Sequence, residues 1–570
     1  MSFNSLNRVI SLMLRVADMQ NATDPVIPFE PQKPAPDISP PAVPLERRIP
    51  EEVGVSSEVI REYVSRLYSE KAAAQQTLLI LRYGKVICEA GFRGYDTHIW
   101  KNLFSASKSV TAVAIGLLMD EHKIKATDKV VDILSGYVTP IVKMKLSSLT
   151  VKHLLTMRSS VMFSEPNSVT DEDWVKGFFN APLKGKPGKT FAYNSLNSYM
   201  LSVIVREVSG ESLTEYLRKR LFEPLGISEY FWERCPRGYE KGGWGLYMKP
   251  EDFAKIGILI QNGGLWEGRR ILSARFISAA VKRQAAVPEE YGGFDYGYQI
   301  WVGRKGNSFL FNGMTGQNLI CFPESGIIVV SNAGNGDIFQ QNEFFRITEE
   351  FFDRRFEGAL PQDKAARSRL KRTLFSVMYP ENKMPFDLRS VLDGKKYFTK
   401  EKHAASVGLY PVLLQAVQNN YSCGTRSIGF DIKDGKFFMI YEQSDETYCM
   451  ELGFSKPVTT VISMHGEEYA VNAGGRFAFD EDGRRVFIME IDFIEFPCKR
   501  IIKMFYDDDE VVFEFSETPG MSLCNNVLNV IFRALRSGFL SSAAISRLDP
   551  DFIKYKTERL FSPVLKGEEI

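Results

Sequence analysis

Residues 103–124, LFSASKSVTAVAIGLLMDEHKI, place a serine and a lysine three positions apart at the start of an apolar run. Residues three apart lie on one face of an α-helix, so Lys108 is expected within reach of the Ser105 hydroxyl. The residues after Lys108 are apolar on nearly every side, which predicts a helix buried in the core. Burial and the positive helix N-terminus both disfavour an ammonium, so the pKa of Lys108 should fall. A neutral lysine would accept the serine proton.

The same spacing occurs again at Ser368 and Lys371, in the charged stretch AARSRLKRTL. Both of those side chains can lie in water, so the Ser-x-x-Lys spacing by itself does not indicate a catalytic pair. For Ser105 and Lys108 the pattern alone leaves two interpretations open. They are a nucleophile with its base, or a serine that caps a helix beside a lysine whose ammonium reaches solvent.

The bulk properties exclude several classes of protein. A chain of 570 residues exceeds the size of one core, so two or more domains are expected. Lys plus Arg is 71 and Asp plus Glu is 70, which gives no footprint for nucleic acid or anionic lipid. No apolar stretch reaches about 18 residues, so no membrane span is expected. The five histidines have no partners at a metal-ligand spacing, and nucleotide-binding and GxSxG motifs are absent, so no metal or cofactor is expected.

Seven cysteines without a CxxC pair lie mostly in apolar runs. This pattern is typical of buried free thiols and predicts a reducing, cytoplasmic compartment.

Composition and periodicity divide the chain into five segments. A short amphipathic helix (Leu6 to Val16) and a Pro-rich tether are expected within residues 1–50. Residues 51–350 carry strands at both ends and helices between them, which predicts an α+β domain whose antiparallel sheet is closed by distant segments. Residues 351–404 read as a charged connector. Strand pairs around Asp-Gly or acidic turns predict a small all-β barrel or sandwich over 405–517, and 518–570 looks helical.

The segment FSASKSVTAVAIGLLMDEHKIKATDKVVDIL resembles the serine β-lactamase and penicillin-binding-protein superfamily, in particular its class C-like esterases and D-peptidases. The resemblance continues in the family's order through LTVKHLLTMRSSV, FAYNSLNSYMLSVIVREVSGESLTEYLRKRLFEPLGI, GGWGLYMKPEDFAKIGILIQNGGLWEGRRIL and YGYQIWV, over roughly residues 50–350. It implies an antiparallel sheet flanked by helices with an all-helical subdomain. The all-β segment resembles the lipocalin-like modules that follow many such domains. It would be a lid or substrate-binding wall, or, as we slightly prefer, a stabilising or oligomerising module.

Carried over position by position, the resemblance makes Ser105 the acylated nucleophile and Lys108 its base. Tyr193 matches the family's Y-x-S tyrosine, which would relay a proton to the leaving group, particularly if Lys108 keeps a phenolate accessible. Ser195 would hydrogen-bond Lys108 or a substrate amide. The residues alone also allow Tyr193 to be an aromatic core residue and Ser195 a turn residue.

The third motif departs from the family. Phe311, Asn312 and Gly313 stand where the family carries Lys-Thr-Gly or His-x-Gly, so the side-chain cation that would bind a substrate carboxylate is missing. Gly313 permits close backbone approach, and the N–H of Met314 would complete an oxyanion hole with the N–H of the nucleophile. Glu165 aligns with no deacylating glutamate and is expected to be a solvated loop residue.

These features together predict a cytoplasmic serine hydrolase that forms an acyl-enzyme with a small ester or amide. D-amino-acid peptides are included among the substrates, and weak activity on β-lactams is expected. Two alternatives stay open from the sequence: a non-catalytic binding protein on the same fold, and an acyltransferase that uses the same acyl-enzyme. The sequence also leaves a homo-oligomer open.

Overall fold

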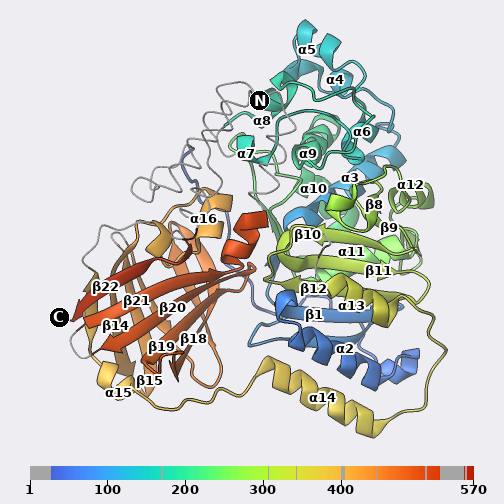
Figure 1. Cartoon of the computed structure of the whole chain (residues 1–570). Coiled ribbons are helices and arrows are strands. Elements are labelled where there is room, and N and C mark those ends of the chain that lie inside the picture. Colours follow the sequence, from blue (N-terminus) through green and yellow to red (C-terminus); the bar gives the residue numbers. More distant parts are fainter. Residues whose placement is uncertain are drawn as a thin grey trace.

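The computed structural model describes residues 27–168, 171–305, 307–339, 341, 343–399, 405–443, 446–507, 510–526, 558 and 561–569. The helix expected from Leu6 to Val16 and most of the helical stretch expected over 518–570 lie outside these residues. Two large antiparallel sheets dominate the described chain, one flanked by helices and one curled into a barrel (Figure 1). No helix among the described residues is long and apolar enough to cross a membrane.

The first sheet joins segments from both ends of the helix-rich region, as the sequence predicts. Its described strands run in the order β2 (Lys85–Gly91), β1 (Gln75–Arg82), β12 (Ile327–Ala333), β11 (Gln317–Phe322), β10 (Phe309–Gly313), β9 (Trp301–Gly303) and β8 (Phe294–Tyr296). The pairing of β1 with β12 closes the sheet across about half of the chain. A hairpin turn at Gly84 joins β1 to β2, and a Pro-Glu-Ser-Gly turn joins β11 to β12.

Helices cover both faces of this sheet because alternate strand residues point to opposite sides. Leu79, Leu81, Leu319 and Val330 pack with α3 (Ser107–Asp120), α11 (Pro250–Gln261) and α12 (Ala274–Ala280). Leu78, Ile80, Ile320 and Val329 pack with α2 (Ser57–Ser69), α13 (Glu343–Phe352) and α14 (Lys364–Met378). The N-terminus of α2 is capped by the Ser56 side chain, which accepts a hydrogen bond from the Glu58 N–H.

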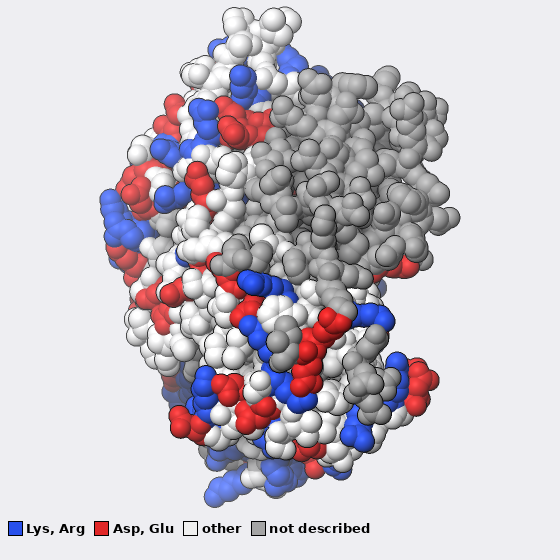
Figure 2. Space-filling view, turned by 90° about the vertical axis from the view of Figure 1, so that its left-hand side faces the viewer, with Lys and Arg blue, Asp and Glu red and all other residues white. Residues whose placement is uncertain are grey.

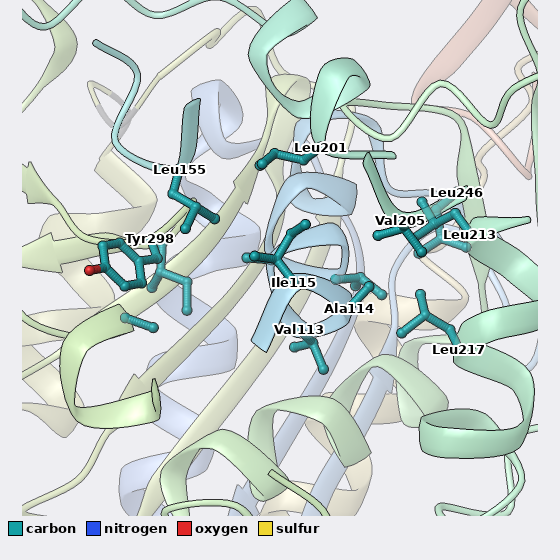
Figure 3. Packing of buried hydrophobic residues seen from close by; sticks show 14 of the residues in the cluster. Val113, Ala114, Ile115, Leu155, Leu201, Val205, Leu213, Leu217, Leu246 and Tyr298 are labelled. Atoms are coloured by element: carbon teal, nitrogen blue, oxygen red, sulfur yellow. The ribbon is translucent and has the colours of Figure 1, made fainter. Parts of the chain in front are cut away.

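The apolar run of the opening motif forms α3, which lies at the centre of the helical region. Every residue of α3 from Ser107 to Leu118 is buried. Figure 3 shows Val113, Ala114 and Ile115 of α3 among Leu201 and Val205 of α9 (Leu196–Ser209) and Leu213 and Leu217 of α10 (Leu213–Leu217). The helical subdomain also includes α4 (Val130–Ile133), α5 (Pro140–Lys145), α6 (Val151–Leu155), α7 (Glu165–Ser168) and α8 (Trp174–Asn180).

A small sheet connects this region to the barrel. Its strands are β3 (Lys101–Asn102), β5 (Leu246–Met248) and β4 (Tyr230–Trp232), paired in that order. Strand β3 ends three residues before Ser105. The position of this sheet therefore fixes how the chain enters α3.

The second sheet is a nearly closed barrel of ten described strands. Their order is β16 (Thr447–Glu451), β15 (Lys436–Gln443), β14 (Thr425–Lys433), β13 (Lys396–Thr399), β22 (Val564–Glu569), β21 (Glu510–Thr518), β20 (Cys498–Asp507), β19 (Arg485–Phe493), β18 (Glu467–Phe479) and β17 (Val458–Met464). Along β15, Phe437, Met439 and Tyr441 are buried and alternate with more exposed residues. The predicted all-β fold is confirmed. Two of its strands differ from the expected bounds, since β13 lies in the stretch expected to be a connector and β22 lies in the stretch 518–570 that was expected to be helical.

The Pro-rich stretch runs without a regular element from residue 27 to the short turn at Pro50. It lies between the two parts of the molecule and is partly buried. Lys33 forms an ion pair with Glu495 of the barrel (3.1 Å), and Asp37 pairs with Lys249 (3.0 Å). On the face drawn in Figure 2, the described basic and acidic side chains are interspersed, in keeping with the balanced composition.

Candidate active site

Ser105 lies on a tight turn directly before α3. Residues Phe104–Ala106 form a 3-10 turn, and the α-helix begins at Ser107, two residues later than the sequence suggests. Phe104 has a φ of +44°, a conformation that a residue with a large side chain rarely adopts. The Asn102 side chain supports this turn by accepting a hydrogen bond from the Phe104 N–H at 2.9 Å.

Lys108 is held against Ser105. Its Nζ lies 2.7 Å from the Ser105 Oγ and 2.7 Å from the backbone oxygen of Gly243. The side chain is buried, so the ammonium does not reach solvent, and α3 has no side-chain cap. Burial lowers the pKa of Lys108 to about 7, although the negative charge of Glu165 opposes the shift. The geometry therefore favours the nucleophile-and-base interpretation over the capping serine with a solvated lysine.

The second Ser-x-x-Lys copy behaves differently. Ser368 and Lys371 lie on exposed positions of α14. The Ser368 hydroxyl donates to the backbone oxygen of Lys364 at 2.9 Å, within its own helix. The two pairs have the same spacing but different surroundings, because α3 is buried on all sides whereas α14 has one exposed face.

Tyr193 borders the Ser–Lys pair. Lys108 Nζ lies 4.9 Å from the centre of its ring, and the phenol hydroxyl is hydrogen-bonded to Ser105. Burial raises the pKa of Tyr193 far above its ordinary value. The hydroxyl therefore keeps its proton at neutral pH, so the phenolate considered from the sequence does not form there. In this state the Tyr193 hydroxyl can donate a proton.

Aromatic rings account for this burial. The Tyr193 ring stacks on Trp301 with centroids 5.7 Å apart and meets Phe339 edge-on at 5.4 Å. Tyr291 lies 4.8 Å from Phe339 and forms the outer part of the group. Tyr193, Tyr291 and Phe339 remain partly exposed, so they form an apolar wall beside the Ser–Lys pair.

Ser195 stands at the N-terminus of α9. Its backbone N–H donates to Glu165 Oε1 at 2.7 Å, and its backbone and Cβ pack closely on Gly243. The described hydrogen bonds of Lys108 go to Ser105 and Gly243, so the expected bond from Lys108 to Ser195 is not formed here. Asn194 anchors the segment by donating to the backbone oxygens of Val161 and Phe163.

Glu165 is the residue that sequence reasoning missed. It was expected to be a solvated loop glutamate, but it begins α7, is half-buried and binds the Ser195 N–H. Its negative charge acts on both Lys108 and Tyr193, raising the pKa of each. No motif marks Glu165, because its place depends on how α7 packs near the start of α9.

The end of β10 meets the nucleophile turn. A Cβ atom on Gly313 would lie 2.3 Å from the Leu103 backbone oxygen, so only glycine allows this approach. Met314 follows at a partly exposed bend. Asn312 points to the opposite sheet face from Phe311, and its Nδ2 donates to the Ile338 oxygen at 3.5 Å.

Phe311 fills the core rather than the site. It is completely buried, and its ring lies 5.8 Å from that of Phe253 on α11. The strand therefore offers no cation at this position, as the sequence indicates. The Phe311 ring adds no apolar surface to the substrate site, because it is turned inward between β10 and α11. Among the described residues, no group of three His, Cys, Asp or Glu could hold a metal ion.

Part of this chain is similar to known proteins. Residues 61–336 match the Beta-lactamase family model. The 6-aminohexanoate-dimer hydrolase of Paenarthrobacter ureafaciens is 26% identical over 286 residues, which cover 44% of this chain and 70% of that protein. Protein flp of Staphylococcus aureus (strain N315) is 27% identical over 207 residues, covering 31% of this chain and 40% of that protein. The crystal structure of FmtA from Staphylococcus aureus superposes with a TM-score of 0.43 at 16% identity, over 57% of this chain and 97% of that one.

The sheet, the buried α3 and the Ser–Lys pair define a β-lactamase-like domain. Residues 61–336 of this chain belong to the serine β-lactamase and penicillin-binding-protein-like superfamily.

Proposed function

We propose that this protein is a serine hydrolase that acylates Ser105, with Lys108 as the general base and Tyr193 as the proton donor to the leaving group. The observation that carries this proposal is the 2.7 Å contact between Lys108 Nζ and Ser105 Oγ, made by a lysine whose pKa is about 7. Such a lysine is partly neutral at physiological pH and can accept a proton.

The reaction follows from these positions. Lys108 takes the Ser105 proton as Oγ attacks the substrate carbonyl, and the backbone N–H groups of Ser105 and Met314 bind the oxyanion that forms. Tyr193 passes its proton to the departing alcohol or amine and regains one from Lys108. Water then attacks the acyl-enzyme, releases the acid and restores Ser105.

The substrates that the site favours are small esters or amides, and uncharged ones are favoured over D-amino-acid peptides, which carry a carboxylate. Phe311 supplies no cation for a substrate carboxylate, and Glu165 adds a negative charge beside the Ser–Lys pair. An anionic β-lactam would therefore be desolvated without a partner. The partly exposed rings of Tyr291 and Phe339 offer an apolar surface to the group next to Tyr193.

We place the protein in the cytoplasm because all seven cysteines, which lie within the described residues, are free thiols. An acyltransferase would share the first half-reaction, with an alcohol or amine replacing water. Product analysis with an added alcohol separates the two, because only a transferase gives the new ester.

A fluorophosphonate probe tests the proposal, because it labels only an activated serine. Peptide mapping should find the label on Ser105 in the wild type and in Ser368→Ala, and no label in Ser105→Ala. Equal labelling of the Ser105→Ala variant would contradict the assignment. A wild type that takes no label at Ser105 would identify the chain as a non-catalytic binding protein on this fold.

A further inference from the structure

The turn between β19 and β20, residues 494–497, lies against the strand that leads to Ser105. The Asn102 N–H donates to the backbone oxygen of Glu495 at 2.9 Å. Trp100 Nε1 donates to the Glu495 carboxylate at 2.6 Å, and Lys101 Nζ donates to the backbone oxygen of Ile494. Three consecutive residues of the helix-rich part, ending three positions before the nucleophile, are thus bound to one turn of the barrel.

The Glu495 carboxylate joins three separate segments. Besides Trp100, it accepts a hydrogen bond from the Ala470 N–H of β18 at 3.0 Å and pairs with Lys33 of the Pro-rich stretch at 3.1 Å. Its side chain is only 1% exposed. A buried carboxylate with this many partners is held in one place, because loss of any partner would leave charge uncompensated.

Asn102 carries this restraint to the nucleophile turn. Its backbone is bound by Glu495, while its side chain accepts the Phe104 N–H and so supports the strained φ of +44° at Phe104. A strained backbone of this kind persists only where its surroundings enforce it. On the other side, the Leu103 N–H donates to the Leu246 oxygen, and the Leu103 oxygen abuts Gly313.

We propose that Glu495 is a positioning residue: through Asn102, the barrel turn fixes the strained turn at Phe104 that presents the Ser105 hydroxyl to Lys108. The barrel is thereby part of the construction of the active site and not only a stabilising module. The effect on catalysis rests on the function proposed for Ser105. The effect on the conformation of the turn is independent of that proposed function.

The test compares two buried carboxylates of the same barrel in the full chain. Glu495→Gln replaces the carboxylate by an amide whose N–H₂ cannot accept from Lys33 or Ala470. Glu517→Gln is the matched control, since Glu517 is also 1% exposed but binds Arg500 and the N–H groups of Val412 and Leu413, away from β3. Both variants should lose similar stability, and both are assayed at a temperature where they are fully folded.

Glu495→Gln should lower kcat for an aryl ester and the rate of fluorophosphonate labelling by about ten- to a hundredfold, because small displacements of a nucleophile are costly. KM should change by less than about twofold, since the substrate wall is untouched. Glu517→Gln should leave both rates near those of the wild type. Equal losses in the two variants at equal folded fraction would overturn the proposal.

Hydrogen exchange gives a second measurement that does not depend on chemistry. In Glu495→Gln, the amides of residues 102–107 should exchange about tenfold faster than in the wild type and in Glu517→Gln, because the turn opens more often. Unchanged exchange there would refute the positioning role even if activity falls. Faster exchange in a protein that never labels at Ser105 would keep the positioning role and reject the proposed function.

Discussion

The Nζ atom of Lys108 lies 2.7 Å from the Oγ atom of Ser105, and the lysine side chain that makes this contact is buried. Burial of the amine and contact with the hydroxyl have one cause, since both follow from α3 beginning inside the core. The same burial gives Lys108 the pKa of about 7 that a base requires at neutral pH.

Replacement of Lys108 by arginine should show whether its positive charge or its ability to accept a proton matters for activity. Lys108→Arg keeps a positive charge but cannot give up its proton near neutral pH, so kcat/KM should fall at least about a hundredfold, as in Lys108→Ala. In the wild type, kcat/KM should rise with pH through about 7, where Lys108 loses its proton. Substantial turnover by the Arg variant would make Lys108 an electrostatic support and require another base.

The stability of the protein should record the same titration. In the unfolded chain a lysine titrates near 10.4, whereas the folded value is about 7, so the unfolded state binds more protons between these values. Native stability contributed by this group therefore rises with pH from about 7 to about 10. Below pH 7 both states are protonated, and the full cost of a buried ammonium is present.

Lys108→Met removes this titration. Its Tm relative to the wild type should be highest below pH 7 and should decline as the pH approaches 10, by differential scanning calorimetry. Ser105→Ala keeps the lysine and should follow the wild-type pH trend. A Tm difference that does not vary with pH would show that Lys108 is not neutral in the folded protein.

Removal of the Glu165 charge should lower the pKa of Lys108 further. Because this carboxylate raises the pKa of Lys108, Glu165→Gln should move the acid limb of kcat/KM to lower pH. An opposite shift would place the glutamate charge elsewhere. A uniform loss of kcat on every ester with accumulation of acyl-enzyme would instead assign Glu165 to deacylation.

β-Lactams should be poor substrates, and Phe311→His should not change this. A chromogenic cephalosporin is expected to react at least about tenfold more slowly than a short-chain aryl ester, given the roughly 1.5–3 kcal/mol of a missing charge-assisted hydrogen bond. The imidazole at position 311 would be buried against Phe253 and not in the site, so the variant should lose stability and keep its substrate preference. Comparable turnover of both substrates by the wild type would contradict this.

Truncation near residue 390 should yield an insoluble protein. Trp100, Ile99 and Tyr247 of the helix-rich part are buried in the same apolar cluster as the barrel residues, and the Lys33–Glu495 pair would lose one partner. Expression of the full chain and of the truncated chain, compared by the soluble fraction, checks this. A soluble and active truncated protein would show that the barrel is a separable module and would also argue against the role of Glu495.

Sequence patterns were sufficient for the parts of the fold that depend on local periodicity. Short apolar runs predict β1 and β12, and alternation predicts β15. The apolar surround of α3 predicts both its burial and the depressed pKa of Lys108. The exposure of the second Ser-x-x-Lys copy, at Ser368 and Lys371, also follows from the sequence, because an amphipathic helix keeps its polar face in water.

Periodicity was insufficient wherever a contact joins distant segments. It predicts that β10 is a strand, but not that Phe311 faces α11, so the direction of that ring follows only from the packing of the two elements. Glu165 follows no pattern that links it to Ser195, which lies thirty positions later and meets it only through the packing of α7.

The sequence by itself determined the contact between Ser105 and Lys108, because residues three apart at the start of a buried helix lie on one face and have few other polar partners there. Only the tertiary structure decided what surrounds that pair: Gly243 at the amine, Glu165 beside it and Glu495 behind the turn. Local spacing specifies which residues share a helix face. Contacts between residues that are far apart in the sequence depend on the packing of the whole chain. The strained turn at Phe104 is kept by those distant partners and by no residue pattern of its own.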